Sequence, residues 1–181
     1  MKHRRKILRM IIAALFLAIA CVLPELTMRI PKLGAMLCLM HIPILLCGFI
    51  CGWNWGAGVG FVAPLLRCLL TGGVAPPIFP TALCMAFELA AYGATAGIMH
   101  KLLPRKKPFV YCSLLTAMLL GRLVWGMSMF ICLGINGTDF TFAAFIAGAL
   151  TNAIPGIIIQ IVLVPITVIL LDKVKILKSI N

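Results

Sequence analysis

Three ionisable side chains stand within stretches of sequence that are otherwise apolar enough to cross a lipid bilayer. They are Arg67, Glu88 and Arg122. A charged side chain at membrane depth costs at least about 2.5–3.5 kcal/mol, so it is seldom kept without a partner, a water-filled cavity or a ligand. Arginine in addition binds carboxylate and phosphate groups in a fork geometry. These three residues therefore point to a binding site for a small polar molecule.

Two of these charged residues have an aromatic neighbour on the same expected helix face. Glu88 and Tyr92 are separated by four positions, and Arg122 and Trp125 by three. At these spacings two side chains lie on one side of an α-helix. A polar group beside an aromatic ring is typical of a pocket for a small molecule that has both a polar part and a flat or apolar part.

Two further polar residues, Asn152 and His41, lie in apolar segments and are candidates for the same pocket. For His41, a hydrogen-bonded core histidine is an equally good interpretation. The alternative for the charges is an internal Arg–Glu pair that pins helices together, with Arg67 extending its guanidinium to the membrane surface. The local balance of two positive charges and one negative charge favours an anionic group, a carboxylate or a phosphate, on any ligand.

The composition identifies the class of protein. The chain has 181 residues, of which 63% are hydrophobic and 11% are charged, whereas soluble domains have roughly 45–50% apolar and about 25% charged residues. We therefore expect an integral membrane protein. Its eight cysteines are scattered singly and form no metal or disulfide pattern, so we expect neither a metal site nor a cofactor. The chain has no HExxH, GxSxG or Walker A motif, which argues against an enzyme.

The apolar segments predict an all-α protein with six transmembrane helices in a single domain over residues 1–181. The Pro- and Gly-rich loop Thr71–Pro80 cannot be helical and separates the third helix from the fourth. A very short turn at Gly52–Gly56 separates the second from the third. The six expected spans are about Ile7–Leu23, ending at Pro24-Glu25; Leu33–Cys51; the segment from that short turn to Leu70; Thr81–Met99; Phe109–Leu133; and Phe142–Leu171.

The distribution of basic residues predicts the orientation. With six spans, the N-terminal stretch, the loop between the fourth and fifth helices and the C-terminal stretch lie on one side and carry twelve Lys and Arg residues. The opposite side carries only Arg29 and Lys32. By the positive-inside rule both termini are cytoplasmic and the Pro/Gly-rich loop faces outward.

This orientation gives each polar residue a depth. At 1.5 Å per residue, Glu88 would lie about 10 Å from the outer side and Asn152 about 15 Å, with Arg67 roughly one turn below the outer end. Arg122 would lie near the middle of its helix, with Trp125 further out. The polar residues thus gather in the outer half, and the inner half offers only Gln160 and Asn54.

Small residues recur at helix-packing spacing. Ala14 and Ala18 form a small-xxx-small step on the first span, which has no strongly polar interior residue, so this face could serve another protein. Packing within the bundle is the default interpretation of the other small residues, which recur every four positions at Gly48, Gly52, Gly56 and Gly60.

The order of these features resembles the substrate-binding (S) components of energy-coupling factor (ECF) vitamin transporters. The resemblance covers most of the chain. It is carried by His41–Phe49, Gly52, Gly56–Phe61, Pro64–Arg67, Pro76–Pro80, Met85–Gly93, Gly121-Arg122 and Asn152–Gly156.

The resemblance implies a six-helix protein of the bacterial cell membrane that holds one vitamin-like molecule near the outer face. It also implies docking on a transmembrane T component coupled to two ATPases, with the S component toppling to release its ligand. The AxxxA motif by which this family contacts the T component would map onto Ala14 and Ala18. The lack of an ATP-binding motif agrees with ATP hydrolysis by the partners.

These observations predict an S component for vitamin uptake. Arg67, Glu88, Arg122 and Asn152 would hold the polar groups of the ligand, with Tyr92 and Trp125 shaping the pocket and His41 as a further lining residue. Pantothenate is the first candidate because its carboxylate suits the positive excess, followed by pyridoxine-type compounds and riboflavin. The alternative functions are a stand-alone secondary transporter or channel, which would need a continuous polar path, and a structural subunit without a ligand.

Overall fold

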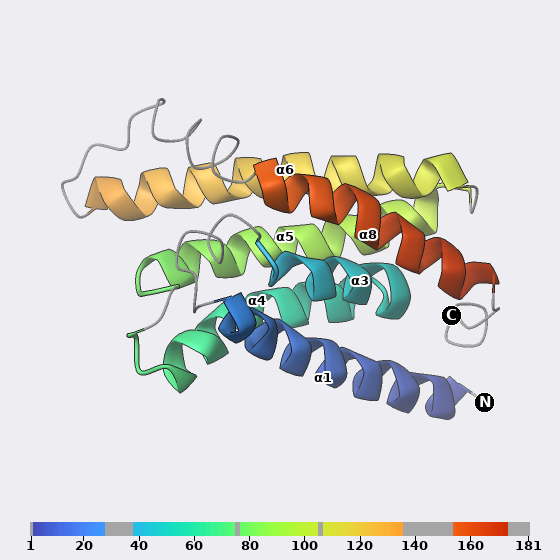
Figure 1. Ribbon diagram of the computed structural model, residues 1–181, viewed down its shortest axis with the longest axis horizontal. Coiled ribbons are helices and arrows are strands. Elements are labelled where there is room, and N and C mark those ends of the chain that lie inside the picture. The colour runs from blue at the N-terminus through green and yellow to red at the C-terminus, as the bar shows by residue number, and fades with distance from the viewer. Residues whose placement is uncertain (1, 28–37, 75–76, 105–106, 136–153, 174–181) are drawn as a thin grey trace.

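The structure is a computed structural model that describes residues 2–27, 38–74, 77–104, 107–135 and 154–173 (Figure 1). The regular elements of this part of the chain are all α-helices, which confirms the all-α prediction there. In chain order they are α1 (Lys2–Thr27), α3 (His41–Cys51), α4 (Trp53–Leu70), α5 (Thr81–Leu102), α6 (Lys107–Ile135) and α8 (Ile154–Lys173).

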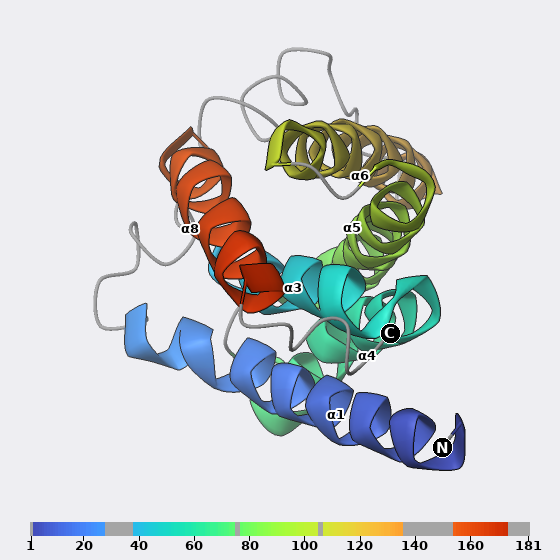
Figure 2. The same ribbon diagram turned by 90° about the vertical axis from the view of Figure 1, so that its right-hand side faces the viewer.

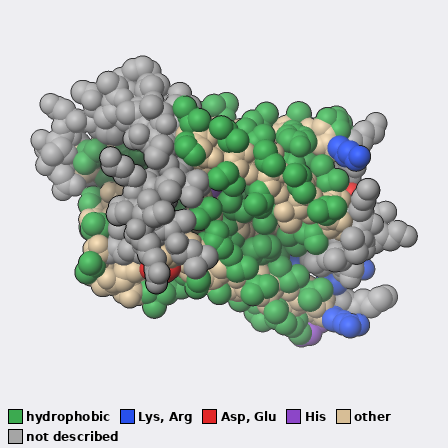
Figure 3. All heavy atoms as spheres, viewed as in Figure 1, with side chains coloured by type: hydrophobic (Ala, Val, Ile, Leu, Met, Phe, Trp, Pro, Cys, Tyr) green, Lys and Arg blue, Asp and Glu red, His purple; other side chains and the backbone are tan. Residues whose placement is uncertain are grey.

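Four of these helices, α1, α5, α6 and α8, are long and apolar enough to cross a membrane, and α3 is a shorter apolar helix. Hydrophobic side chains cover much of the described surface in view, and the Lys and Arg side chains in view gather at one end of the bundle (Figure 3). The beginning of α1 and the end of α8 lie at this same end (Figure 1). This arrangement is that of a multi-pass membrane protein, while the number of six spans and the orientation stay predictions.

The first helix continues past the point where the sequence was expected to end it. α1 includes Pro24 and extends to Thr27. Its last turns are held by Arg67, whose Nη1 donates to the backbone carbonyl of Cys21 at 2.8 Å and lies 3.1 Å from the carboxylate of Glu25. The bound guanidinium of Arg67 stabilises a helical turn that Pro24 would otherwise interrupt.

The expected turn at Gly52–Gly56 is a single residue in the structure. Gly52 adopts a φ of +95° and α4 begins at once with Trp53. With a ψ of 171°, Gly52 occupies a backbone region that essentially only glycine adopts, so the remaining residues of the expected turn are free to be helical. The start of the expected second span and the beginning of the expected last span, before Ile154, lie outside the described residues.

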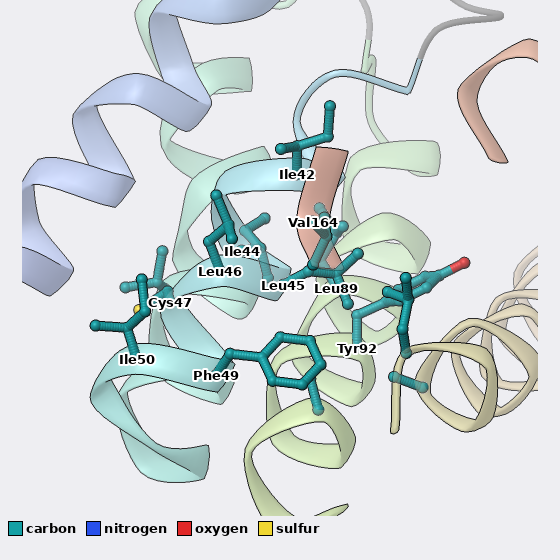
Figure 4. Close-up of a cluster of buried hydrophobic side chains, with 14 of the residues drawn as sticks. Ile42, Ile44, Leu45, Leu46, Cys47, Phe49, Ile50, Leu89, Tyr92 and Val164 are labelled. Atoms are coloured by element: carbon teal, nitrogen blue, oxygen red, sulfur yellow. The ribbon is translucent and has the colours of Figure 1, made fainter. Parts of the chain in front are cut away.

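Helix α3 lies at the centre of the bundle, with α1, α4, α5 and α8 around it (Figure 2). Each of its eleven residues is buried. Leu45 and Phe49 of α3 pack in one apolar cluster with Leu89 and Tyr92 of α5 and Val164 of α8 (Figure 4). The apolar core therefore surrounds α3, and the residues at the N-terminal end of α3 face the centre of the molecule.

The backbones of α3, α4 and α5 touch one another through glycines. A Cβ atom on Gly60 would overlap the backbone carbonyl of Leu89, and a Cβ atom on Gly97 would overlap the backbone nitrogen of Trp53. The predicted packing role is therefore confirmed for three of the four glycines at four-residue spacing, whereas Gly52 forms the turn. We call this region the glycine junction; it consists of Gly48, Gly56, Gly60, Gly93 and Gly97.

Candidate functional site

The carboxylate of Glu88 is the centre of a buried polar cluster. Nη1 of Arg122 donates to Oε1 of Glu88 at 2.9 Å, and Nε2 of His41 lies 3.4 Å from the same oxygen. Glu88 is 1% exposed and His41 2%. Three helices thus bring one anion, one cation and one imidazole together inside the apolar bundle. We call these residues the His41–Glu88–Arg122 cluster.

Short-range structure orients the imidazole of His41. Its Nδ1 lies 3.2 Å from the backbone carbonyl of Cys38, in the turn that precedes α3, where Cys38 adopts a φ of +47°. Both ring nitrogens therefore face acceptors, an amide carbonyl and a carboxylate. A neutral imidazole carries one N–H, so both contacts are donated together only by the imidazolium.

Tyr92 packs against the cluster, as its spacing from Glu88 predicted. Its ring meets the imidazole of His41 edge to face, with centroids 5.1 Å apart and an interplanar angle of 87°. A Cβ atom on Gly121 would lie 2.6 Å from Cδ2 and Cε2 of this ring. Because Gly121 has no side chain, α6 approaches the tyrosine closely enough for the adjacent Arg122 to reach Glu88.

The guanidinium of Arg122 is mostly buried, with 15% of its side chain exposed. Its Nη2 lies 3.9 Å from Sγ of Cys38, a weak acceptor. Its Nε is buried and has no hydrogen-bond partner in the part of the chain that the structure describes. The arginine therefore has one strong ionic contact and a further N–H for a ligand.

Arg67 does not join the cluster around Glu88. It is 2% exposed and pairs with the carboxylate of Glu25. The expectation that Arg67 extends to the membrane surface is thus wrong, because α1 and α4 bury it between them. Two arginines now face two carboxylates, so the positive excess inferred from the sequence is balanced by Glu25.

Two residues that the sequence predicted for the pocket remain, Trp125 and Asn152. Trp125 is half-buried and lies on α6 about one turn beyond Arg122. Asn152 lies outside the described residues.

Gln160 is a buried polar residue that the sequence did not assign to the site. It is 1% exposed, and neither its Nε2 nor its Oε1 has a hydrogen-bond partner in the described structure. It precedes Val164, which packs in the core cluster with Leu45 of α3 (Figure 4). Helices α3 and α8 run in the same direction (Figure 1). Gln160 lies about one turn before Val164 on α8, and His41 about one turn before Leu45 on α3.

The sequence had suggested that Gln160 lies in the inner half, and the structure adds that its side chain is buried on α8. The signal for this was present in the sequence. Gln160 shares its helix face with Val164 and Val168, at spacings of four and eight, and both valines are buried. A lone amide on the buried face of an apolar helix indicates a ligand or a polar partner.

The chain was also compared with known proteins. A family model described as "ECF transporter, substrate-specific component" matches residues 8–168. This match extends from α1 to α8 and includes every residue of the cluster. No curated protein and no solved structure matches the chain.

Proposed function

The chain belongs to the substrate-specific components of ECF transporters, and from this membership we propose that it binds one vitamin or related micronutrient with high affinity for import. Members of this family are transport subunits and not enzymes. The ligand would bind at the His41–Glu88–Arg122 cluster, with Tyr92 and Gln160 as further contacts and Trp125 and Asn152 at the edge of the pocket. Arg67 would support the site from outside it, through α1 and α4.

The observation that carries this proposal is a set of buried polar atoms that the described protein leaves without a partner. Three of these four atoms are Nε of Arg122 and both polar atoms of Gln160; the fourth, Oδ1 of Asp172, lies near the other end of α8. A buried donor or acceptor without a partner costs about 1–3 kcal/mol. A ligand that supplies these hydrogen bonds recovers that free energy on binding, which supports high affinity at this position.

Pantothenate remains the first candidate ligand, because its carboxylate could accept from Arg122 and its hydroxyl and amide groups could bond to Gln160. The ion pair between Arg67 and Glu25 removes the charge excess that placed an anion ahead of neutral compounds. Pyridoxine-type compounds and riboflavin therefore stand close behind, and binding to a panel of these vitamins decides between them.

We expect isothermal titration calorimetry of the purified chain to show tight binding of one vitamin in such a panel. Arg122→Lys keeps a cation beside Glu88 but lacks Nε, so we expect it to weaken binding by at least about tenfold. Gln160→Leu should also weaken binding, while it stabilises the ligand-free protein by about 1–3 kcal/mol because two unpartnered polar atoms leave the core.

This opposite effect on affinity and stability distinguishes a ligand contact from a structural residue. Thermal unfolding of the ligand-free protein measures the stability. A matched control is Thr167→Val on the same helix. Among the described residues the Thr167 hydroxyl donates to the Leu163 carbonyl of its own helix at 2.8 Å, so this variant should change neither quantity greatly. No binding to any vitamin, or unaltered affinity in both variants, would contradict the proposed site.

The proposed transport complex contains a transmembrane T component and two cytoplasmic ATPases, in the bacterial plasma membrane. The proposed topology has six spans with both termini in the cytoplasm. Its support is the gathering of the Lys and Arg side chains in view at the end of the bundle where α1 begins and α8 ends (Figure 1, Figure 3). The His41–Glu88–Arg122 cluster lies away from this end, toward the side predicted to be extracellular.

The exposed face of α1 supports a docking role. Ala14 and Ala18 are exposed, whereas Ala13 and Ala20 of the same helix are buried against the bundle. Small residues on an exposed membrane helix let a second helix approach closely. The AxxxA step is thus directed outward, where the T component would be.

We expect Ala14→Leu/Ala18→Leu to abolish co-purification of the T component and the ATPases, since two large side chains would separate the helix backbones. Vitamin binding by the isolated chain should persist, because neither alanine packs inside the bundle. Cys112→Leu, at an exposed position of α6, is the size-matched control and should leave assembly intact. Assembly that survives the double substitution would exclude this face.

A further inference from the structure

A second candidate site lies at the opposite end of the bundle from the His41–Glu88–Arg122 cluster. A cleft of about 770 Å³ opens there between the start of α1, the turn from α3 to α4 and the end of α5. Lys6 and Arg9 line it from α1, Lys101 from α5, and Trp53 and Trp55 from α4. Three helices therefore direct basic and aromatic side chains into one concave surface.

The charges of this cleft are of one sign. Its described lining contains three cations and no carboxylate. The positive-inside rule requires basic residues at this end of the bundle, but it does not require residues from two helices to share one cleft. An anion bound in the cleft would be attracted by each of these cations.

The remaining lining residues suit the boundary between water and lipid. Trp53 and Trp55 are 48% and 36% exposed, and tryptophan is enriched at the level of lipid headgroups. Leu103 adds apolar surface. The first turn of α4 also lies at the cleft, and the first N–H groups of a helix have no partner within it and favour anions.

We propose that this cleft binds the headgroup phosphate of an anionic phospholipid of the phosphatidylglycerol type. Basic pockets between transmembrane helices on the cytoplasmic side are recognised sites for such headgroups. The volume of about 770 Å³ is far larger than a phosphate ion needs, and it leaves room for the glycerol and the start of the acyl chains beside the tryptophans. The lipid would join α1 to α5 at an end of the bundle remote from the vitamin.

The test uses the full chain with Trp125→Phe, so that its fluorescence comes from Trp53 and Trp55 alone among the three tryptophans. Quenching by phosphatidylglycerol with brominated acyl chains is compared with quenching by brominated phosphatidylcholine in mixed micelles. We expect brominated phosphatidylglycerol to quench the fluorescence clearly more strongly than brominated phosphatidylcholine. The triple variant Lys6→Gln/Arg9→Gln/Lys101→Gln should lose this preference by at least about tenfold.

The matched control is Arg4→Gln/Arg5→Gln/Lys107→Gln, which removes the same three charges near the same end but from residues that do not line the cleft. It should retain the preference within about twofold. An equal loss in the control would show that only net charge attracts the lipid and would overturn the proposal. Equal quenching by both lipids in the parent protein would overturn it as well.

A free inorganic phosphate ion would offer the cleft the same phosphate group as a lipid headgroup. Inorganic phosphate, added at the ionic strength of a sodium chloride reference, should not displace the lipid; displacement would assign the cleft to a free phosphate and overturn the proposal. If the triple variant does not fold, Lys101→Gln alone, at an exposed position near the end of α5, should lose several-fold in preference. Unchanged preference in that variant would contradict the lipid site.

Discussion

Glu88→Ala is expected to lower the free energy of unfolding by about 3–5 kcal/mol, the cost of leaving a buried charge without its partner. In the structure the Glu88 carboxylate accepts the 2.9 Å bond from Arg122 and faces the Nε2 of His41 at 3.4 Å. Alanine would remove both contacts at once and leave the guanidinium in an apolar bundle. Thermal unfolding in detergent, with and without the ligand, measures the loss.

Two further variants separate charge from shape at this position. Glu88→Gln keeps an acceptor for Arg122 but removes the negative charge, so its loss of stability should lie between those of the parent and the alanine variant. Glu88→Met/Arg122→Met replaces the pair with apolar residues and should recover most of the stability. It should not recover vitamin binding. A Glu88→Ala protein as stable as the parent would show that the charge pair does not hold the bundle together.

Gly93→Ala should destabilise the protein although it adds one methyl group. A Cβ atom at Gly93 would overlap the backbone carbonyl of Gly56. A backbone group cannot move aside as a flexible side chain can, so α4 and α5 must separate, at a cost of about 1–3 kcal/mol or more. The shift would also displace Glu88 and Tyr92, which lie on the same helix, and we expect vitamin affinity to fall with stability.

Gly58→Ala is the matched control for this prediction. Gly58 also lies in the helical bundle, on α4, but a Cβ atom there would meet nothing within 4 Å. Alanine is favoured over glycine inside a helix by roughly 0.5–1 kcal/mol, so this variant should be as stable as the parent or slightly more stable. Equal melting temperatures for Gly93→Ala and Gly58→Ala would contradict the close backbone contact.

Much of the fold follows from properties that act locally in the sequence. Long apolar segments predicted the long helices, and the cost of a charge in such a segment correctly indicated that Glu88 and Arg122 would not stand alone. The glycine spacing predicted packing because close helix contact requires residues without side chains. The contact of Tyr92 with the site followed from its place one turn after Glu88.

The partner of Arg67 could not be predicted in the same way. Glu25 follows Pro24, which was expected to end the first helix, so its carboxylate was assigned to a loop. Which side of α4 faces α1 depends on the packing of whole helices, not on either sequence segment alone. Gly121 is not part of a run of small residues at four-residue spacing, so only the tertiary structure shows that it makes room for the ring of Tyr92.

The glycine junction has a consequence for how a ligand enters. Backbone rests directly on backbone across α3, α4 and α5, so no flexible side chain stands between them and these three helices should move as one rigid body. Helix α6 instead meets this body through side chains, the Tyr92 ring and the Arg122–Glu88 bond. A motion of α6 away from this body would have to break that ion pair and also separate the buried apolar residues of α6, such as Leu114 and Ala117, from the bundle.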